Sequence, residues 1–136
     1  MLFRSVAKSK IENIKSREQE LNRMKEMVDE AIQILQNPKA PIEDLGRLLH
    51  QNWLYKRSLS DKVSTPEIDH LYEEAMRVGA LGGKLLGAGG GGFLLLFVKP
   101  ELQPKVQERL RHLIHVPFRF ETSGSRVVLY QPDGLS

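Results

Sequence analysis

The chain has 136 residues, no cysteine and a net charge of +3. That length suits one domain with one core, and the lack of thiols excludes disulfides, thiolate zinc sites and cysteine nucleophiles. The polar N-terminal region predicts no signal peptide, and the longest apolar run, Phe93 to Val98, is too short to cross a bilayer. Basic and acidic residues alternate, so we expect a cytoplasmic protein that binds neither nucleic acid nor membranes.

Three helices are predicted before the first strand. The first runs from about Arg4 to Gln36 and ends at Asn37-Pro38, because the residue before proline avoids the α region. Its apolar positions follow helical spacing and predict the buried face: Ile11, Ile14, Leu21, Met24, Val28, Ala31, Ile32 and Leu35. The second begins after Pro41 and fades near Leu59 to Asp61.

The start of the third helix has two interpretations. Ser64 and Glu67 form a capping box, or Thr65 caps the helix with Pro66 in its first turn. In either case Gly79 is suited to follow the helix, because glycine accepts positive φ.

The second half of the chain predicts strands. A short strand at Lys84 to Leu86 enters a glycine tract, and Phe93 to Val98 is apolar throughout, as expected of a strand buried on both faces. Pro100 opens a fourth helix reaching Ile114, and a final hairpin pairs residues 117–121 with residues 126–130. The predicted fold class is therefore α+β, with helices packed on one face of a roughly four-stranded antiparallel sheet.

The segment Gly87-Ala88-Gly89-Gly90-Gly91-Gly92 is the strongest functional signal. Five of its six residues are glycine, the residue that is costliest to order. One interpretation is a loop whose N–H groups hold a phosphate; the other is a tight hairpin tip or a crowded crossing. The pattern is neither a Walker loop nor a dinucleotide fingerprint, because it lacks Gly-Lys-Ser/Thr and precedes a strand.

Other candidate residues give weaker signals. Lys84 either supplies a positive charge to a phosphate or is an ordinary exposed lysine. His112 and His115 share a helical face by spacing, but no third ligand is evident, so we expect no metal site. The polar and aromatic segment from His50 to Arg57 either faces a substrate or surrounds a core Trp53. No catalytic residue can be assigned.

The segment from Val78 to Phe93 resembles the third conserved motif of the GHMP kinases, approximately Gly-Ala-x-Gly-Ala-Lys-x-x-Gly-Ala-Gly-Gly-Gly-Gly. Gly83 stands where that motif has alanine. Within the superfamily the chain is most similar to sugar kinases of the D-glycero-D-manno-heptose phosphate type, over about Arg4 to Tyr130. The resemblance implies that residues 1–136 form the C-terminal domain, with helices over a four-stranded antiparallel sheet.

The resemblance also implies a function. The complete enzyme would transfer the γ-phosphate of ATP, with Mg²⁺, to a sugar or sugar phosphate, and the glycine loop would help enclose the phosphates. The N-terminal ATP-binding kinase domain is not found in this chain, so we expect little kinase activity from it alone. An exposed domain face predicts a homo-oligomer. The alternative is a non-catalytic module that binds a phosphorylated metabolite, or a plain interaction domain.

Overall fold

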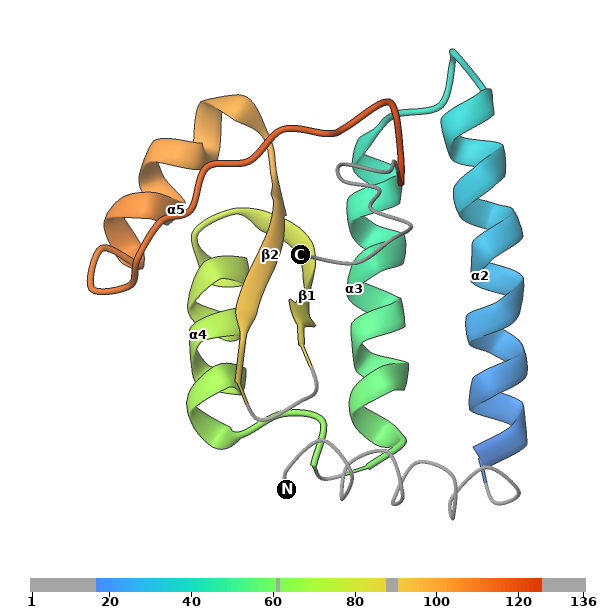
Figure 1. Ribbon diagram of the computed structural model, residues 1–136, viewed down its shortest axis with the longest axis horizontal. Helices are drawn as coiled ribbons and strands as arrows, with labels where there is room; N and C mark the ends of the chain where they lie inside the picture. Colours follow the sequence, from blue (N-terminus) through green and yellow to red (C-terminus); the bar gives the residue numbers. More distant parts are fainter. Residues whose placement is uncertain (1–16, 61, 88–90, 126–136) are drawn as a thin grey trace, which may run out of the picture.

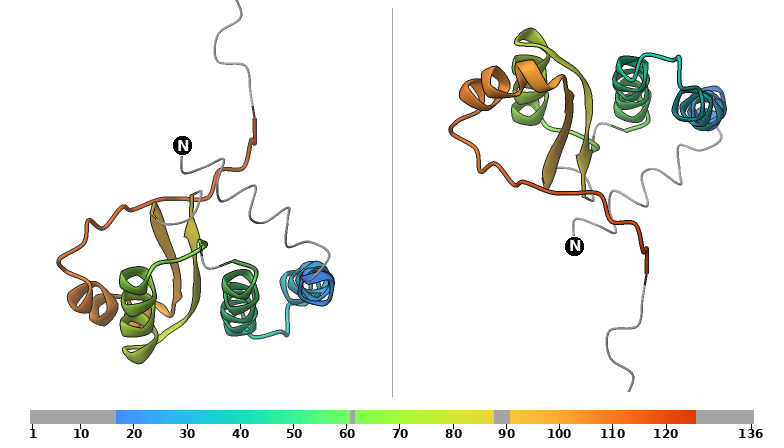
Figure 2. Two further views of the ribbon diagram at one scale, coloured as in Figure 1. Left: turned by 90° about the horizontal axis from the view of Figure 1, so that it is seen from below. Right: turned by 90° about the horizontal axis from the view of Figure 1, so that it is seen from above.

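A computed structural model describes residues 17–60, 62–87 and 91–125 of the chain. In chain order the elements are α2 (Glu18–Gln36), α3 (Glu43–Ser58), α4 (Pro66–Arg77), β1 (Ala80–Leu86), β2 (Phe93–Val98), a 3-10 turn (Pro100–Leu102) and α5 (Gln103–Arg109). Across the molecule α4 lies beside β2, then come β1, α3 and α2 (Figure 1). Views from above and below also place α2 on the outer side of α3 (Figure 2). None of the helices in the described ranges has the length and apolar content needed to cross a bilayer.

Local signals set the helix boundaries as predicted. Helix α2 ends at Gln36, immediately before Asn37-Pro38. Of the two interpretations for α4, the second is confirmed: the Thr65 hydroxyl accepts a hydrogen bond from the Ile68 N–H, and Pro66 occupies the first turn. Ser64 instead donates to the Asp69 carboxylate at 2.6 Å. Gly79 follows α4 with φ of +120°, as the sequence predicts.

The two strands form an antiparallel hairpin, which confirms the α+β class. Leu86 pairs with Phe93 at the glycine loop, and Ala80 pairs with Val98 at the opposite end. Because directly opposed residues share a face, Leu85, Leu94 and Leu96 lie on one face, and Lys84, Leu86, Phe93 and Leu95 lie on the other.

The core lies on the Leu85 face of the hairpin. One cluster joins Trp53 of α3, Tyr72 of α4 and Val63 to Leu85, with Leu94 and Leu96 packed against it. A second cluster joins Ala75 of α4, Ala80 and Val106 of α5. Side chains of α3, α4 and α5 thus meet in this core. The backbone of α3 itself approaches β1 at Gly82, on the face that also holds Lys84.

Helix α3 crosses β1 at a point where two glycines meet. A Cβ at Gly82 would lie 2.0 Å from the Gly46 carbonyl oxygen and 2.8 Å from the His50 backbone nitrogen. A Cβ at Gly83 would lie 2.4 Å from the Leu95 carbonyl oxygen. These glycines therefore serve close packing of backbone against backbone.

Three predictions for the strands and the last helix need correction or remain open. Helix α5 ends at Arg109 instead of reaching Ile114, because Val106 is its only buried residue and Ile114 is 92% exposed. Residues 117–121 form no strand, because no described segment pairs with them. Their predicted partner, residues 126–130, lies outside the described residues, so four strands are not confirmed and the described sheet has two.

Burial also differs from prediction in two places. Strand β2 is not buried on both faces: Phe93 is 63% exposed and the rest of the strand is half-buried, because the described elements cover only one of its faces well. In α2 the buried residue is Met27, whereas Val28, Ile32 and Leu35 are exposed, so the predicted buried face was wrong for those three. The part of that helix predicted before Arg17 lies outside the described residues.

Candidate functional site

The candidate site is the loop that joins β1 to β2. Gly87, Gly91 and Gly92 belong to the described residues, whereas Ala88, Gly89 and Gly90 lie outside them. The loop begins where Leu86 pairs with Phe93, at the end of the hairpin where the strands become exposed. The structure thus places the tract at a hairpin tip, as one of the two interpretations expected.

The hairpin itself explains two of these glycines. Gly87 has φ of +131° and Gly92 has φ of +127°, conformations that residues with a Cβ rarely adopt. A Cβ at Gly92 would also lie 2.1 Å from the Leu86 carbonyl oxygen. These two positions need glycine to reverse the chain, whether or not a ligand binds.

Gly91 has no such reason among the described residues. A Cβ placed on it would meet no atom of the described residues within 4 Å. Packing against the described residues therefore does not require glycine there. Open space at a residue without a side chain leaves its backbone accessible to a bound molecule.

Lys84 lies on β1 opposite Leu95, on the same face as Leu86 and Phe93. Its side chain is half-exposed, and no described carboxylate pairs with it. Two residues of extended strand separate Lys84 from Leu86, about 7 Å. The role of Lys84 toward a bound anion stays a prediction.

The aromatic segment of α3 serves the core. Trp53 is fully buried, which confirms the core interpretation for that residue. His50 Nδ1 lies 2.8 Å from Tyr72 Oη, and the two rings stack at 7°. Burial raises the pKa of Tyr72 to about 12, although the Gly83 N–H lowers it in part.

This raised pKa predicts a loss of stability in alkali. The unfolded chain ionises Tyr72 near pH 10, whereas the folded chain keeps it neutral until about pH 12. The stability that the neutral phenol contributes is therefore complete below pH 10 and is lost as the pH rises through 12. We expect a loss of about 2 to 3 kcal/mol over that range, measured by denaturant unfolding at successive pH values. Tyr72→Phe should remove this part of the pH dependence, whereas Tyr55→Phe should keep it. Equal profiles for the two variants would contradict the assignment.

A cleft of about 170 Å³ lies at the other end of the hairpin, and the sequence did not predict it. Ile42, Glu43 and residues 97–101 line it. The Lys99 ammonium lies 2.7 Å from Glu43, and this contact lowers the pKa of Glu43 and raises that of Lys99. Fifty-six positions separate the partners, so no sequence spacing could have indicated the pair. Strand β2 separates this cleft from the glycine loop.

The histidines at the C-terminal side of α5 do not share a helix face. The helix ends at Arg109, so His112 lies in a turn and His115 follows in an irregular segment. Among the residues with described positions, no group of three or more His, Asp or Glu side chains is arranged to hold a metal ion.

Fold and loop together define a class: a small α+β domain in which helices pack against a two-stranded hairpin that ends in a glycine-rich loop. Residues 37–115 match the family described as GHMP kinases C terminal, and the chain belongs to this family. That range includes α3, α4, the hairpin and α5. The kinase family that the motif around Gly87 predicted is thereby confirmed.

Two curated relatives are similar to parts of the chain. The D-glycero-alpha-D-manno-heptose 7-phosphate kinase of Campylobacter jejuni is 36% identical over 73 residues, which is 54% of this chain and 22% of that protein. The mevalonate kinase of Methanocaldococcus jannaschii is 34% identical over 67 residues, which is 49% of this chain and 20% of that protein. The matched region thus spans about a fifth of the length of these relatives.

A solved structure has the same fold. It is the crystal structure of L. major mevalonate kinase in complex with R-mevalonate, with a TM-score of 0.66 and 23% identity. The match covers 81% of this chain and 34% of that one. The architecture is therefore that of part of a larger kinase chain.

Proposed function

We propose that the chain acts as the C-terminal part of an ATP-dependent sugar kinase whose substrate resembles a heptose phosphate. The complete enzyme uses ATP and Mg²⁺, is cytoplasmic, and combines residues 1–136 with an N-terminal kinase domain. The part of the phosphate site contributed by this chain is Lys84, Gly87, Ala88, Gly89, Gly90, Gly91 and Gly92.

The observation that carries this proposal is the open position at Gly91. Gly82, Gly83, Gly87 and Gly92 each have a reason within the chain, either a close backbone contact or a positive φ. Gly91 makes no close contact with the described residues that would exclude a side chain. A backbone N–H without a neighbouring side chain can approach a phosphate closely. The 36% identity to a heptose 7-phosphate kinase supports a sugar phosphate as the molecule that approaches it.

In the complete enzyme a sugar hydroxyl oxygen forms a bond to the γ-phosphorus of ATP as the bond to the ADP oxygen breaks, and the hydroxyl proton passes to solvent. Such transfers depend mainly on positioning and on neutralising the phosphate charge. The residues of this chain supply backbone N–H groups from the loop and one cation, Lys84, which no described carboxylate neutralises. Mg²⁺ supplies the remaining charge neutralisation when it is bound.

The test uses a complete kinase that carries this domain. Valine in place of Gly90 or Gly91 should reduce kcat at least about 100-fold, because a side chain would separate the loop N–H groups from the phosphate. Lys84→Met should weaken sugar-phosphate binding by about tenfold or more, the value of a hydrogen bond to a charged group. Lys39→Met, at an exposed site before α3, is the matched control and should leave both quantities unchanged.

Two results would contradict the proposal. Unchanged turnover in the valine variants, with unaltered folding by circular dichroism, would refute the role of the loop. Calorimetry separates the alternative: a complete protein that binds sugar phosphate but transfers no phosphate from ATP would be a non-catalytic binding module.

A further inference from the structure

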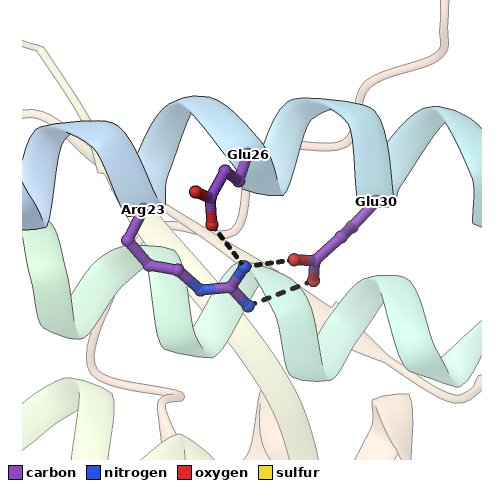
Figure 3. A network of polar contacts seen from close by, with 3 residues as sticks. All are labelled: Arg23, Glu26 and Glu30. Atoms are coloured by element: carbon purple, nitrogen blue, oxygen red, sulfur yellow. Dashed lines mark hydrogen bonds and ion pairs between the residues drawn. The ribbon is translucent and has the colours of Figure 1, made fainter.

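Helix α2 has two apolar sides, and only one of them packs against the described part of the domain. The side facing α3 holds Met27, which is only 3% exposed, together with the half-buried Met24, Ala31 and Ile34. Beside this surface Arg23 bonds both Glu26 and Glu30, in a network that occupies a second side of the helix (Figure 3). These two sides account for the packing of α2 on the domain and for part of its solvated surface.

A third side of α2 is apolar and uncovered by the described elements. Val28 is 57% exposed, Ile32 45% and Leu35 63%, and the half-buried Leu21 completes the row. At 100° per residue these four positions fall within about 60° of one another around the helix. We call Leu21, Val28, Ile32 and Leu35 the outer stripe. Because α2 is the outermost helix, no described element lies beyond it to cover this stripe (Figures 1 and 2).

Two opposite charges flank one edge of the outer stripe. Lys25 and Asp29 lie one turn apart there, and neither makes an ion pair with any residue of the described ranges. Arg23, by contrast, is already shared between two carboxylates on another side of the helix. The charges beside the stripe are thus available to a partner.

We propose that the outer stripe binds a second copy of this chain, with the two α2 helices antiparallel about a two-fold axis at Val28. In this arrangement Leu21 of one copy faces Leu35 of the other, because each lies seven residues, about 10 Å, from Val28. The same symmetry keeps the charged edges of both copies together and brings Lys25 of one near Asp29 of the other, twice. A parallel pair would instead place the two charged edges on opposite sides of the interface, where neither pair forms, so charge complementarity favours the antiparallel arrangement.

The outer stripe provides a surface for the self-association expected from the sequence, and this dimer does not depend on the kinase activity proposed above. One helix face per copy is a small interface, and interfaces below about 1,200 Å² are typically transient. We therefore expect a monomer–dimer equilibrium that depends on concentration. A permanent dimer is not expected from this contact alone.

Sedimentation velocity of the 136-residue chain over a concentration series is the first test. The wild type should associate reversibly, and Val28→Glu should raise the dimer dissociation constant at least about tenfold by burying two unpaired charges. The matched control is Ile114→Glu, at a position that is 92% exposed and outside any helix; it should associate like the wild type. A wild type that stays monomeric, or a Val28→Glu variant that still dimerises, would overturn the inference.

Charge reversal tests the orientation. Lys25→Glu and Asp29→Lys should each weaken the dimer, and the double variant should restore it, because both reciprocal pairs re-form with exchanged signs. In a parallel dimer the two residues do not meet across the interface, so neither single reversal should change the dissociation constant. Single variants that dimerise like the wild type, or a double variant that fails to recover, would exclude the antiparallel register.

Cysteine cross-linking measures the same geometry directly, since the chain has no native cysteine. Val28→Cys should form an intermolecular disulfide under oxidation, because the axis brings the two positions together. Leu21→Cys should not, since the two copies of this position would be about 21 Å apart, far beyond disulfide range. Efficient cross-linking at position 21 would show a parallel dimer and overturn the proposal.

Discussion

Replacing Gly82 by alanine is expected to destabilise the domain by about 3 kcal/mol or more, at the upper end of what overpacking usually costs. The added Cβ would lie 2.0 Å from the Gly46 carbonyl oxygen and 2.8 Å from the His50 backbone nitrogen. Both are backbone atoms of α3, so no side chain can rotate to relieve the contact. Helix α3 would have to move away from β1, which would loosen the core around Trp53.

The measurement is thermal or denaturant unfolding of the variant beside a matched control. A loss of about 3 kcal/mol corresponds to a melting temperature lower by roughly 10 °C in a domain of this size. Gly91→Ala is the control, because a Cβ there meets no atom within 4 Å, and it should melt within a degree or two of the wild type. Equal stability of the two variants would mean that α3 does not approach β1 as closely as described.

Truncating Trp53 to alanine is the second substitution with a large expected effect, about 3 to 5 kcal/mol. The indole is fully buried and packs with Val63, Tyr72 and Leu85, its ring centroid 5.9 Å from that of Tyr72. Removing it leaves a cavity between α3, α4 and β1, where backbone contacts at Gly82 limit collapse. The measurement is denaturant unfolding followed by circular dichroism, with the fluorescence of Trp53, the only tryptophan in the chain, as a second probe of the wild type.

Trp53→Phe distinguishes the effect of lost side-chain volume on stability from the effect of the buried indole N–H. The indole Nε1–H is buried and has no hydrogen-bond acceptor among the described residues. An unpaired buried donor costs about 1 to 3 kcal/mol, so phenylalanine, which lacks it, should recover most of the stability lost in alanine. Phe120→Ala, at a side chain that is 92% exposed, should leave the unfolding curve unchanged. A Trp53→Phe variant as unstable as the alanine variant would indicate that the Nε1–H has a partner.

The sequence predicted the boundaries of elements well where local chemistry determines them. The Asn37-Pro38 stop, the Thr65 cap with Pro66, and Gly79 after α4 each act through the backbone of neighbouring residues. Such signals need no knowledge of the rest of the fold. The same is true of the change from helical period to continuous apolar residues at Phe93, which marks β2.

Burial, strand pairing and the roles of the glycines depend on tertiary contacts, and the sequence did not predict them. Met27 and Val28 are adjacent and both apolar, and only the position of α3 determines which of them is buried. Residues 117–121 alternate like a strand, but a strand also needs a partner edge, and no pattern within five residues can supply one. The roles of the glycines were likewise inseparable in the sequence, because steric contact at Gly82 and open space at Gly91 depend on distant atoms.

The hairpin is held unequally along its length. At one end Ala80 is buried and Lys99 is tied to Glu43, whereas at the other Leu86 is 40% exposed and Phe93 is 63% exposed. Because fewer contacts hold the strands at the exposed end, thermal motion of β1 and β2 should be greatest where Leu86 pairs with Phe93. Ordering the strand ends around Leu86 and Phe93 would then cost part of the binding free energy of any molecule that contacts them.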